Sequence, residues 1–314
     1  MPKKIKTIFI GTPDFGVPSL VKLINDEYFD IVSVITQEDK KIGRKRELKA
    51  PAIKQTALKY NLPVLQPKKI SDIIEKIKQL SPDLIIVIAY SQIIPKQILD
   101  IPKYEVLNIH GSLLPKYRGA SCVQAAIANG NKTTGVTIMK MDEHLDTGPI
   151  LSQAKIKINN TDTAEILFDK LSQLGADILI PAIKNYINKK IKPMSQDNFK
   201  SSYVGTLKKS DGRVNWNKSA EEQERFIRAM HPWPGSFGEL KTENQTIKII
   251  GVEHKPALIN KHKPGTIFLD NNKLFIQCAK NSLEIKNLQL SGKKIMAAQE
   301  FINGYSKYIG KILE

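Results

Sequence analysis

The feature that most constrains this chain is an alternation, within residues 1–189, of short apolar runs with helical patterns. The runs are rich in β-branched residues and apolar on both faces; they cover residues 5–10, 31–35, 84–89, 106–109 and 136–139. Strands without a polar face must be covered on both sides, so helices are expected on both faces of the sheet. Residues 71–80 and 120–128 supply helical spacing between the runs. The pattern predicts an open, mostly parallel, Rossmann-like α/β sheet.

The pattern changes after the strongest helical segment of the chain, residues 163–187, in which Pro181 is a candidate break. A polar, lysine-rich stretch follows. We interpret residues 190–207 as a linker, which makes residues 1–189 a first domain.

Residues 208–314 have a different character. One helix is expected at 220–230, followed by strands separated by Asn- and Asp-rich turns; these strands cover residues 247–252, 266–269, 274–278 and 283–288. Short strands with frequent turns favour a small C-terminal β-barrel, OB-like in type.

Lysine and arginine outnumber acidic residues by 48 to 31, a formal net charge of +17 that is spread over both parts. Such an excess favours a polyanionic partner, nucleic acid ahead of a membrane surface; the plainer alternative is a solvated, lysine-rich surface. The densest basic segment, residues 40–49, includes Arg44, Lys45 and Arg46 and follows a predicted strand. It is therefore expected at the same edge of the sheet as a ligand site.

Several other classes of protein are disfavoured. The turn from Gly11 to Gly16 lacks the glycine spacing of a dinucleotide site, and the chain has no GxSxG elbow. His110 and His144 are not at metal-ligand spacing, so no metal is expected. No apolar run suits a signal peptide or a membrane span, so we expect no membrane partner and a cytoplasmic protein.

The most informative chemistry follows the predicted strand 106–109. Side chains two apart on a strand point to the same side, so Asn108 and His110 can converge on one small volume. An amide donor beside an imidazole suits acyl transfer, since the amide stabilises an oxyanion and the imidazole moves a proton. The plainer interpretation of His110 is a hydrogen-bonded structural residue. Ser112, Leu113, Leu114 and Pro115 offer a hydroxyl and peptide groups beside an apolar wall, which suits a flat heterocycle.

A carboxylate is needed to orient the imidazole. Asp146 lies in a polar loop after the strand that ends near residue 139, and two strand ends can bring it to His110. Asp142 and Glu143 lie in the same loop. Spacing alone leaves all three acids open.

Two motifs carry a resemblance to a known family. The sequences NIHGSLLP (108–115) and HLDTGPI (144–150) resemble the folate-dependent formyltransferases. The resemblance implies that Asn108, His110 and Asp146 form the catalytic group, that residues 112–115 line the formyl-folate site, and that 10-formyltetrahydrofolate is the formyl donor. The motifs are shared by enzymes that formylate glycinamide ribonucleotide or an amino sugar and by hydrolases of the same folate. They therefore indicate the formyl donor but not the acceptor.

Further segments indicate which molecule accepts the formyl group. FIGTPDFGVPSL (9–20), TQEDKKIGRK (36–45), DGRVNW (211–216) and RAMHPWPGSF (228–237) resemble stretches of the family members that formylate methionyl-tRNA. The resemblance implies initiator methionyl-tRNA as substrate and a C-terminal domain that contacts tRNA. We expect a monomer. The segment 40–49 departs from the family pattern, with Lys45-Arg46-Glu47 where a second glycine is expected. We assign Arg44, Lys45 and Arg46 to tRNA binding. A sugar formyltransferase and a non-catalytic tRNA-binding protein are the alternatives.

Overall fold

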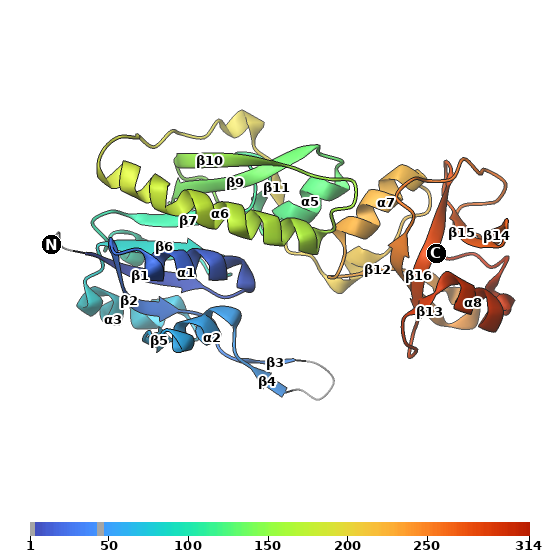
Figure 1. The fold of residues 1–314 in the computed structure, drawn as a ribbon, viewed down its shortest axis with the longest axis horizontal. Helices are drawn as coiled ribbons and strands as arrows, with labels where there is room; N and C mark the ends of the chain where they lie inside the picture. Colours follow the sequence, from blue (N-terminus) through green and yellow to red (C-terminus); the bar gives the residue numbers. More distant parts are fainter. Residues whose placement is uncertain (1–3, 43–46) are drawn as a thin grey trace. The chain divides into compact units, whose positions relative to one another are not determined.

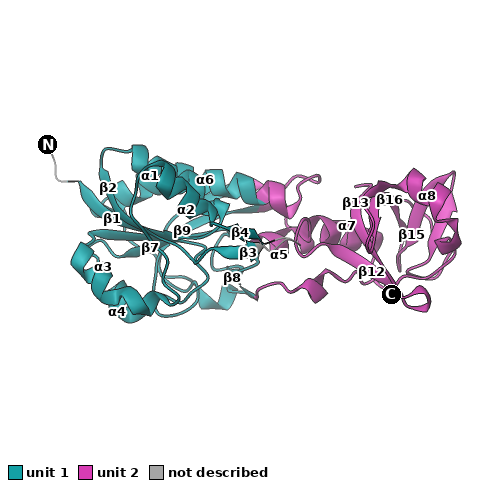
Figure 2. Cartoon of the chain, turned by 90° about the horizontal axis from the view of Figure 1, so that it is seen from below, with its two compact units in different colours: residues 1–122, 134–156, 168–204 teal, residues 123–133, 157–167, 205–314 magenta. Residues whose placement is uncertain are grey.

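The computed structural model describes residues 4–42 and 47–314 (Figure 1). The chain forms two compact units, coloured separately in Figure 2. The first unit comprises residues 1–122, 134–156 and 168–204, and the second comprises residues 123–133, 157–167 and 205–314. The second unit thus includes two short segments that precede residue 168 as well as the C-terminal part of the chain. The predicted division into domains at residues 189 and 208 stays a proposal.

The first unit is built on a seven-stranded sheet with the order β10-β9-β7-β6-β1-β2-β5. Its strands are β1 (Ile5–Gly11), β2 (Phe29–Ile35), β5 (Val64–Leu65), β6 (Leu84–Ile88), β7 (Val106–His110), β9 (Thr133–Lys140) and β10 (Ile150–Lys157). The five strands from β5 to β7 pair in parallel, whereas β9 runs antiparallel to β7. Every residue of β6 and β7 is buried. The predicted Rossmann-like, mostly parallel sheet is confirmed.

Helices cover both faces of this sheet, as its apolar strands require. Figure 2 shows α1 (Val17–Asn25) and α6 (Ala164–Ile187) on one face and α3 (Ile74–Leu80) and α4 (Lys96–Leu99) on the other. Two more helices, α2 (Ala52–Lys59) and α5 (Cys122–Ala128), also connect strands. The candidate break at Pro181 does not end α6. Pro181 is exposed, so a main-chain carbonyl that it leaves without a hydrogen bond can be solvated.

The segment that the sequence predicts as a linker packs against the first unit over most of its length. Met194 exchanges two main-chain hydrogen bonds with Ile150, each 2.8 Å long. Farther along, β11 (Tyr203–Val204) pairs in parallel with β8 (Arg118–Gly119). Residues 190–204 are therefore part of the first unit, and their polar composition reflects an exposed surface segment rather than a free connection.

The second unit contains an antiparallel sheet with the order β12-β13-β16-β15-β14, and β17 pairs with β16. Its strands are β12 (Ser236–Leu240), β13 (Gln245–Val252), β14 (Ile267–Asp270), β15 (Lys273–Gln277), β16 (Ser282–Leu290) and β17 (Met296–Ala297). Helices α7 (Ala220–Ala229) and α8 (Ala298–Gly304) belong to it, and Ser219 and Glu222 cap α7 reciprocally. Apolar side chains of Trp216, Ile227 and Phe301 share one buried core with the sheet. This small, antiparallel domain agrees with the predicted OB-like type; β12 was not predicted.

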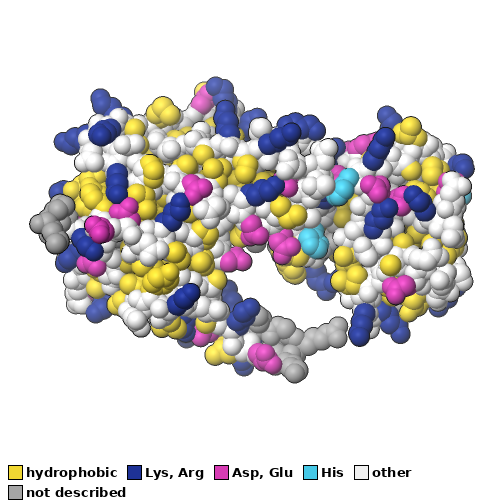
Figure 3. Space-filling model, viewed as in Figure 1, with side chains coloured by type: hydrophobic (Ala, Val, Ile, Leu, Met, Phe, Trp, Pro, Cys, Tyr) yellow, Lys and Arg dark blue, Asp and Glu magenta, His cyan; other side chains and the backbone are white. Residues whose placement is uncertain are grey.

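The following observations bear on the predicted basic segment, on the basic surface and on the expected absence of a membrane span. The strands β3 (Lys40–Ile42) and β4 (Glu47–Lys49) form an antiparallel pair. Arg44, Lys45 and Arg46 fall outside the described residues. On the face drawn in Figure 3, Lys and Arg side chains are dispersed over both units among acidic and apolar side chains. Within the described ranges, no helix has the length and apolar character that crossing a membrane requires.

Candidate active site

Asn108 and His110 lie at the carboxyl end of β7, between β6 and β9. Asn108 is opposite Val87 on one side and Met139 on the other. Both side chains are largely buried, with 8% exposed, and the predicted convergence follows from their spacing of two on one strand. In the part of the chain that the structure describes, no side chain or main-chain group forms a hydrogen bond with the Asn108 amide. That amide is therefore available to a substrate.

Both ring nitrogens of His110 face hydrogen-bond acceptors. Nε2 lies 2.9 Å from the carbonyl oxygen of Tyr117, and Nδ1 lies 3.6 Å from Oδ2 of Asp146. Two facing acceptors favour the doubly protonated imidazolium. The distance of 3.6 Å is too long for a hydrogen bond, so the carboxylate and the imidazole can still tighten, or admit a water, when substrates bind.

The pKa of His110 reflects opposing effects. Burial by itself lowers this pKa. The Cys122 sulfur, followed by the Asp146 carboxylate and the Tyr117 carbonyl, more than offsets burial and raises the pKa to about 9. At neutral pH the ring is therefore a cation that can donate protons to developing negative charge.

The structure distinguishes the three acids that spacing left open. Asp146 Oδ2 faces His110 and accepts a hydrogen bond of 2.7 Å from the main-chain nitrogen of Gly119. The Asp142 carboxylate is instead occupied by the Thr147 hydroxyl, at 2.7 and 2.8 Å. The Glu143 side chain is 59% exposed and lies 3.9 Å from a lysine. Asp146 is therefore the acid placed to orient the imidazole.

Ser112 lies at the start of the segment proposed to contact folate. Its side chain is fully buried, and its hydroxyl donates a 2.7 Å hydrogen bond to the carbonyl of Lys116. Its own carbonyl accepts from the hydroxyl of Thr137 at 2.7 Å. The hydroxyl is thus directed into the protein, so the proposed contact of Ser112 with folate is left to its main chain. The role of the hydroxyl here is to hold the turn.

The other three residues of this segment differ in how far they are buried. Leu114 is buried against Met139 and Ile150, and its carbonyl accepts a 2.9 Å hydrogen bond from Gln153. Leu113 and Pro115 are half-buried. A proposed folate contact in residues 112–115 therefore rests on the side chains of Leu113 and Pro115 and on the main chain of the segment.

Two residues of the site were missed by sequence reasoning. The Arg118 side chain is buried and donates to Oε1 of Gln196 from Nε at 3.1 Å and from Nη2 at 2.8 Å. Gln196 in turn donates to the main-chain carbonyls of Asp146 and Gly148. Gln196 lies fifty positions after Asp146, in a polar stretch without periodicity. No local pattern could have indicated it.

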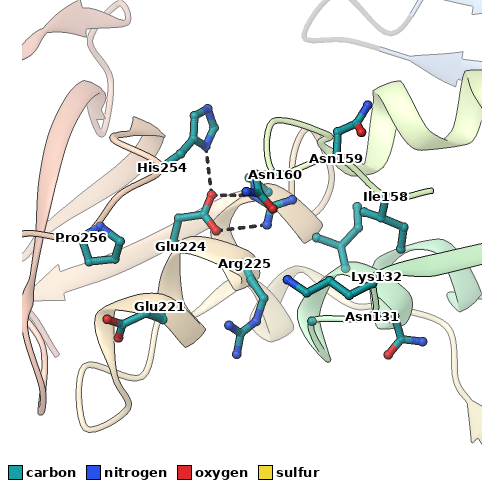
Figure 4. A pocket seen from close by; sticks show the side chains of 13 residues that line it. Asn131, Lys132, Ile158, Asn159, Asn160, Glu221, Glu224, Arg225, His254 and Pro256 are labelled. Carbon is teal, nitrogen blue, oxygen red and sulfur yellow. Dashed lines mark hydrogen bonds and ion pairs between the residues drawn. The ribbon is translucent and has the colours of Figure 1, made fainter.

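A polar cavity of about 180 Å³ lies in the second unit (Figure 4). The side chains of Glu224 and His254 point toward each other at its wall, with Glu224 Oε1 3.0 Å from His254 Nδ1. Glu224 also pairs with Arg228, and its side chain is 7% exposed. Since this carboxylate is shared by two partners of its own unit, we assign it a structural role. Among the described residues, no group of three or more His, Cys, Asp or Glu is placed to hold a metal.

The fold and the site together define a class. An open α/β sheet that carries an amide, an imidazolium and a carboxylate at its strand ends is suited to acyl or formyl transfer. The family comparison identifies the class more closely: the formyl transferase model matches residues 3–183, and the model of the formyl transferase C-terminal domain matches residues 206–306. The chain belongs to the formyl transferase family.

Relatives match over almost the whole chain. A methionyl-tRNA formyltransferase of Thermodesulfovibrio yellowstonii is 46% identical over 299 residues, which are 95% of this chain and 95% of that protein. A methionyl-tRNA formyltransferase of Bacillus cytotoxicus is 42% identical over 310 residues, 98% of each chain. A solved N-formyltransferase from Helicobacter canadensis, in complex with folinic acid and dTDP-3-aminofucose, superimposes with a TM-score of 0.67 at 22% identity, covering 90% of this chain and 98% of its own. That likeness shows the fold.

Proposed function

We propose that the protein transfers the formyl group of 10-formyltetrahydrofolate to the amino group of methionine on initiator methionyl-tRNA, giving N-formylmethionyl-tRNA. The observation that carries the chemistry is the pairing of His110 with Asp146 beside the unengaged amide of Asn108. The acceptor is supported by the full-length similarity to methionyl-tRNA formyltransferases.

The reaction begins when the neutral amine of methionine attacks the formyl carbon and a new carbon–nitrogen bond forms. The Asn108 amide and the His110 imidazolium donate to the resulting oxyanion. Asp146 holds the imidazolium and accepts the proton that the amine loses, directly or through water. The oxyanion then re-forms the carbonyl as the bond to N10 of the folate breaks, and the proton held by Asp146 passes to N10, directly or through water, as tetrahydrofolate leaves. Holding amine and formyl group together lowers the barrier further through orientation.

One incubation tests the function. The protein is mixed with 10-formyltetrahydrofolate and charged initiator tRNA, and N-formylmethionine is measured after hydrolysis of the ester. A parallel incubation with amino sugar nucleotides tests the sugar formyltransferase alternative. Formylation of an amino sugar without formylation of methionyl-tRNA would overturn the proposal. Binding of tRNA without any transfer would favour the non-catalytic alternative.

The role of Asn108 gives a first prediction. Changing Asn108 to alanine should raise the barrier to formyl transfer by about 3 kcal/mol, the usual scale for removing one oxyanion donor. Asn108→Asp, nearly isosteric but without the amide donor, should be similarly slow. Single-turnover rates measure the effect, and circular dichroism checks that both variants fold. A normal rate in Asn108→Asp would show that the amide donor takes no part.

For tRNA binding we propose Arg44, Lys45 and Arg46, which fall outside the described part of the chain; their charge and their place after β2 support the assignment. The chain leaves β2 at the carboxyl edge of the sheet, where ligands usually bind in open α/β folds and which the aminoacylated 3′ end must reach. Arginine there can both pair with phosphates and stack on unpaired bases.

Changing these three residues together to glutamine should flatten the slope of log affinity for tRNA against log salt by about 2, since each phosphate contact contributes about 0.7 to 0.9. Affinity for the formyl donor should be unchanged. The measurement is tRNA binding at several salt concentrations, with Lys68, Lys69 and Lys76 changed together as a control of equal charge. If both triple variants had the slope of the unaltered protein, Arg44, Lys45 and Arg46 would make no contact with phosphates and the segment would be an ordinary solvated one.

We further propose that the protein acts as a monomer in the cytoplasm, where charged tRNA is available. Light scattering at the concentration of the assay tests the first part of this statement.

A further inference from the structure

Gln196 stands apart from its neighbours in an exposed segment. Between residues 192 and 200, every side chain is exposed except that of Gln196, which is half-buried. A long polar side chain that turns inward from such a segment gives up solvation, so it must find partners inside. Its partners are the groups that surround Asp146.

The amide of Gln196 is fully used. Oε1 accepts two hydrogen bonds from the Arg118 guanidinium. Nε2 donates to the carbonyl oxygens of Asp146 at 2.9 Å and Gly148 at 2.8 Å. Turning the amide around would place its oxygen against two carbonyls and its nitrogen against a guanidinium, so this network determines its orientation.

The loop held by Gln196 has an uncommon main-chain conformation. Asp146 has a φ of 53°, in the left-handed region that non-glycine residues rarely adopt. At Gly148, a Cβ atom would lie 1.8 Å from the carbonyl oxygen of Lys140, so the loop turns closely against β9. A residue in such a conformation persists only when its surroundings hold it there. The two donors of Gln196 hold the main chain on both sides of Thr147.

Arg118 anchors Gln196 and closes a ring of contacts. Its side chain is 1% exposed, and Nη1 donates to the Tyr203 hydroxyl at 2.8 Å. The next residue, Gly119, donates its main-chain N–H to the Asp146 carboxylate. Asp146 is thus held at its side chain through β8 and at its carbonyl through Gln196.

We propose that Gln196 is a positioning residue for formyl transfer, which keeps the Asp146 carboxylate directed at His110, with Arg118 as its anchor. Gln196 acts through Asp146 and makes no contact with the reacting atoms. The proposal rests on the proposed function, because the readout is the same reaction.

The test compares two substitutions that both give Arg118 a new carboxylate. Gln196→Glu keeps the acceptor for Arg118 but removes both donors to the loop. Asn198→Asp is the matched control, since the Asn198 Oδ1 also accepts from Arg118, at 2.8 Å, and has no hydrogen bond to the loop in the described structure. Gln196→Met, similar in volume and without donors, replaces Gln196→Glu if the added charge prevents folding.

Gln196→Glu should lower kcat about 10- to 100-fold, the scale of a misplacement near 1 Å, while KM for the formyl donor changes little. The alkaline limb of its pH profile should move to lower pH, because Asp146, after Cys122, helps to raise the pKa of His110 to about 9. Asn198→Asp should retain kcat within about twofold and the normal profile, as expected for a surface change.

Normal kcat and an unshifted pH profile in Gln196→Glu and Gln196→Met would overturn the proposal. Equal losses in Asn198→Asp would also overturn it, since they would trace the effect to Arg118 alone. If the unaltered protein formylated no methionyl-tRNA, the proposed function itself would be wrong. That result differs from the two outcomes above, which compare variants of an active protein.

Discussion

Changing His110 to alanine is expected to slow formyl transfer about 10³-fold, within the usual range for losing a positioned acid–base group. The side chain is largely buried and lies between the Tyr117 carbonyl and the Asp146 carboxylate. A water molecule in its place would be neutral and would not replace the positive charge of the imidazolium. The loss should fall on kcat, because a cation that meets the developing oxyanion acts mainly in the transition state.

The control for this variant is His144→Ala. His144 is exposed and lies in the same loop as Asp146, so its removal takes away an imidazole without touching the pair. Single-turnover rates of both variants, with matched unfolding temperatures, give the comparison. A His110→Ala protein that is folded and within fivefold of the normal rate would show that the imidazolium is a structural group.

The geometry at β7 was predictable because it depends on local rules. Side chains at 108 and 110 share one side of any strand, and a strand end in an open α/β sheet is the usual place for a ligand. Nothing about distant parts of the chain is needed for that inference. The parallel direction of the central strands follows from the same kind of pattern, since continuous β-branched runs require cover on both faces. The order of the strands in the sheet was not predicted.

The choice of Asp146 was not predictable from spacing, because it depends on a main-chain conformation. The left-handed φ of Asp146 and the close approach at Gly148 set the direction of the carboxylate, and Gln196 holds both from fifty residues away. Contacts of this kind leave no periodic pattern. The family resemblance identified the residue; the structure supplies the physical reason.

The strand β10 was missed, and the main-chain pairing of the polar segment after α6 was not predicted, for a related reason. β10 has a fully buried start but alternates half-buried and exposed residues after Ser152, with lysines on its exposed side. Such a strand resembles a surface loop in composition. The segment around Gln196 is exposed at nearly every side chain, and it is held by main-chain pairing at Met194 and β11 and by hydrogen bonds from the distant Arg118. Composition reports the solvation of side chains, whereas these segments are held by main-chain pairing and by contacts with distant residues.

Asp146→Asn should lower kcat about 10³- to 10⁴-fold while leaving the local geometry intact, the scale seen when an acid that orients a histidine becomes an amide. The asparagine oxygen can still accept from the Gly119 N–H, so the loop has no reason to move. The negative charge beside Nδ1 is lost. Glu143→Gln, the same charge change at an exposed position of the loop, is the control.

The pH profile separates this role from a loss of packing. Burial lowers the pKa of His110, but Cys122 and then Asp146 and Tyr117 raise it to about 9, so the imidazolium persists up to that pH. Because the folded-state pKa lies above the unfolded value of about 6.5, protonation stabilises the fold fully below pH 6.5, and this contribution is lost as pH rises through about 9. In Asp146→Asn the pKa of His110 should fall, so both the alkaline loss of activity and the alkaline loss of stability should begin at lower pH.

The acidic limb of the pH profile should stay in place, since the methionine amine of the substrate sets it. Activity and unfolding free energy measured from pH 6 to 10 give both limits. An alkaline limb that is unmoved in Asp146→Asn, at whatever rate, would mean that this carboxylate does not govern the charge of His110.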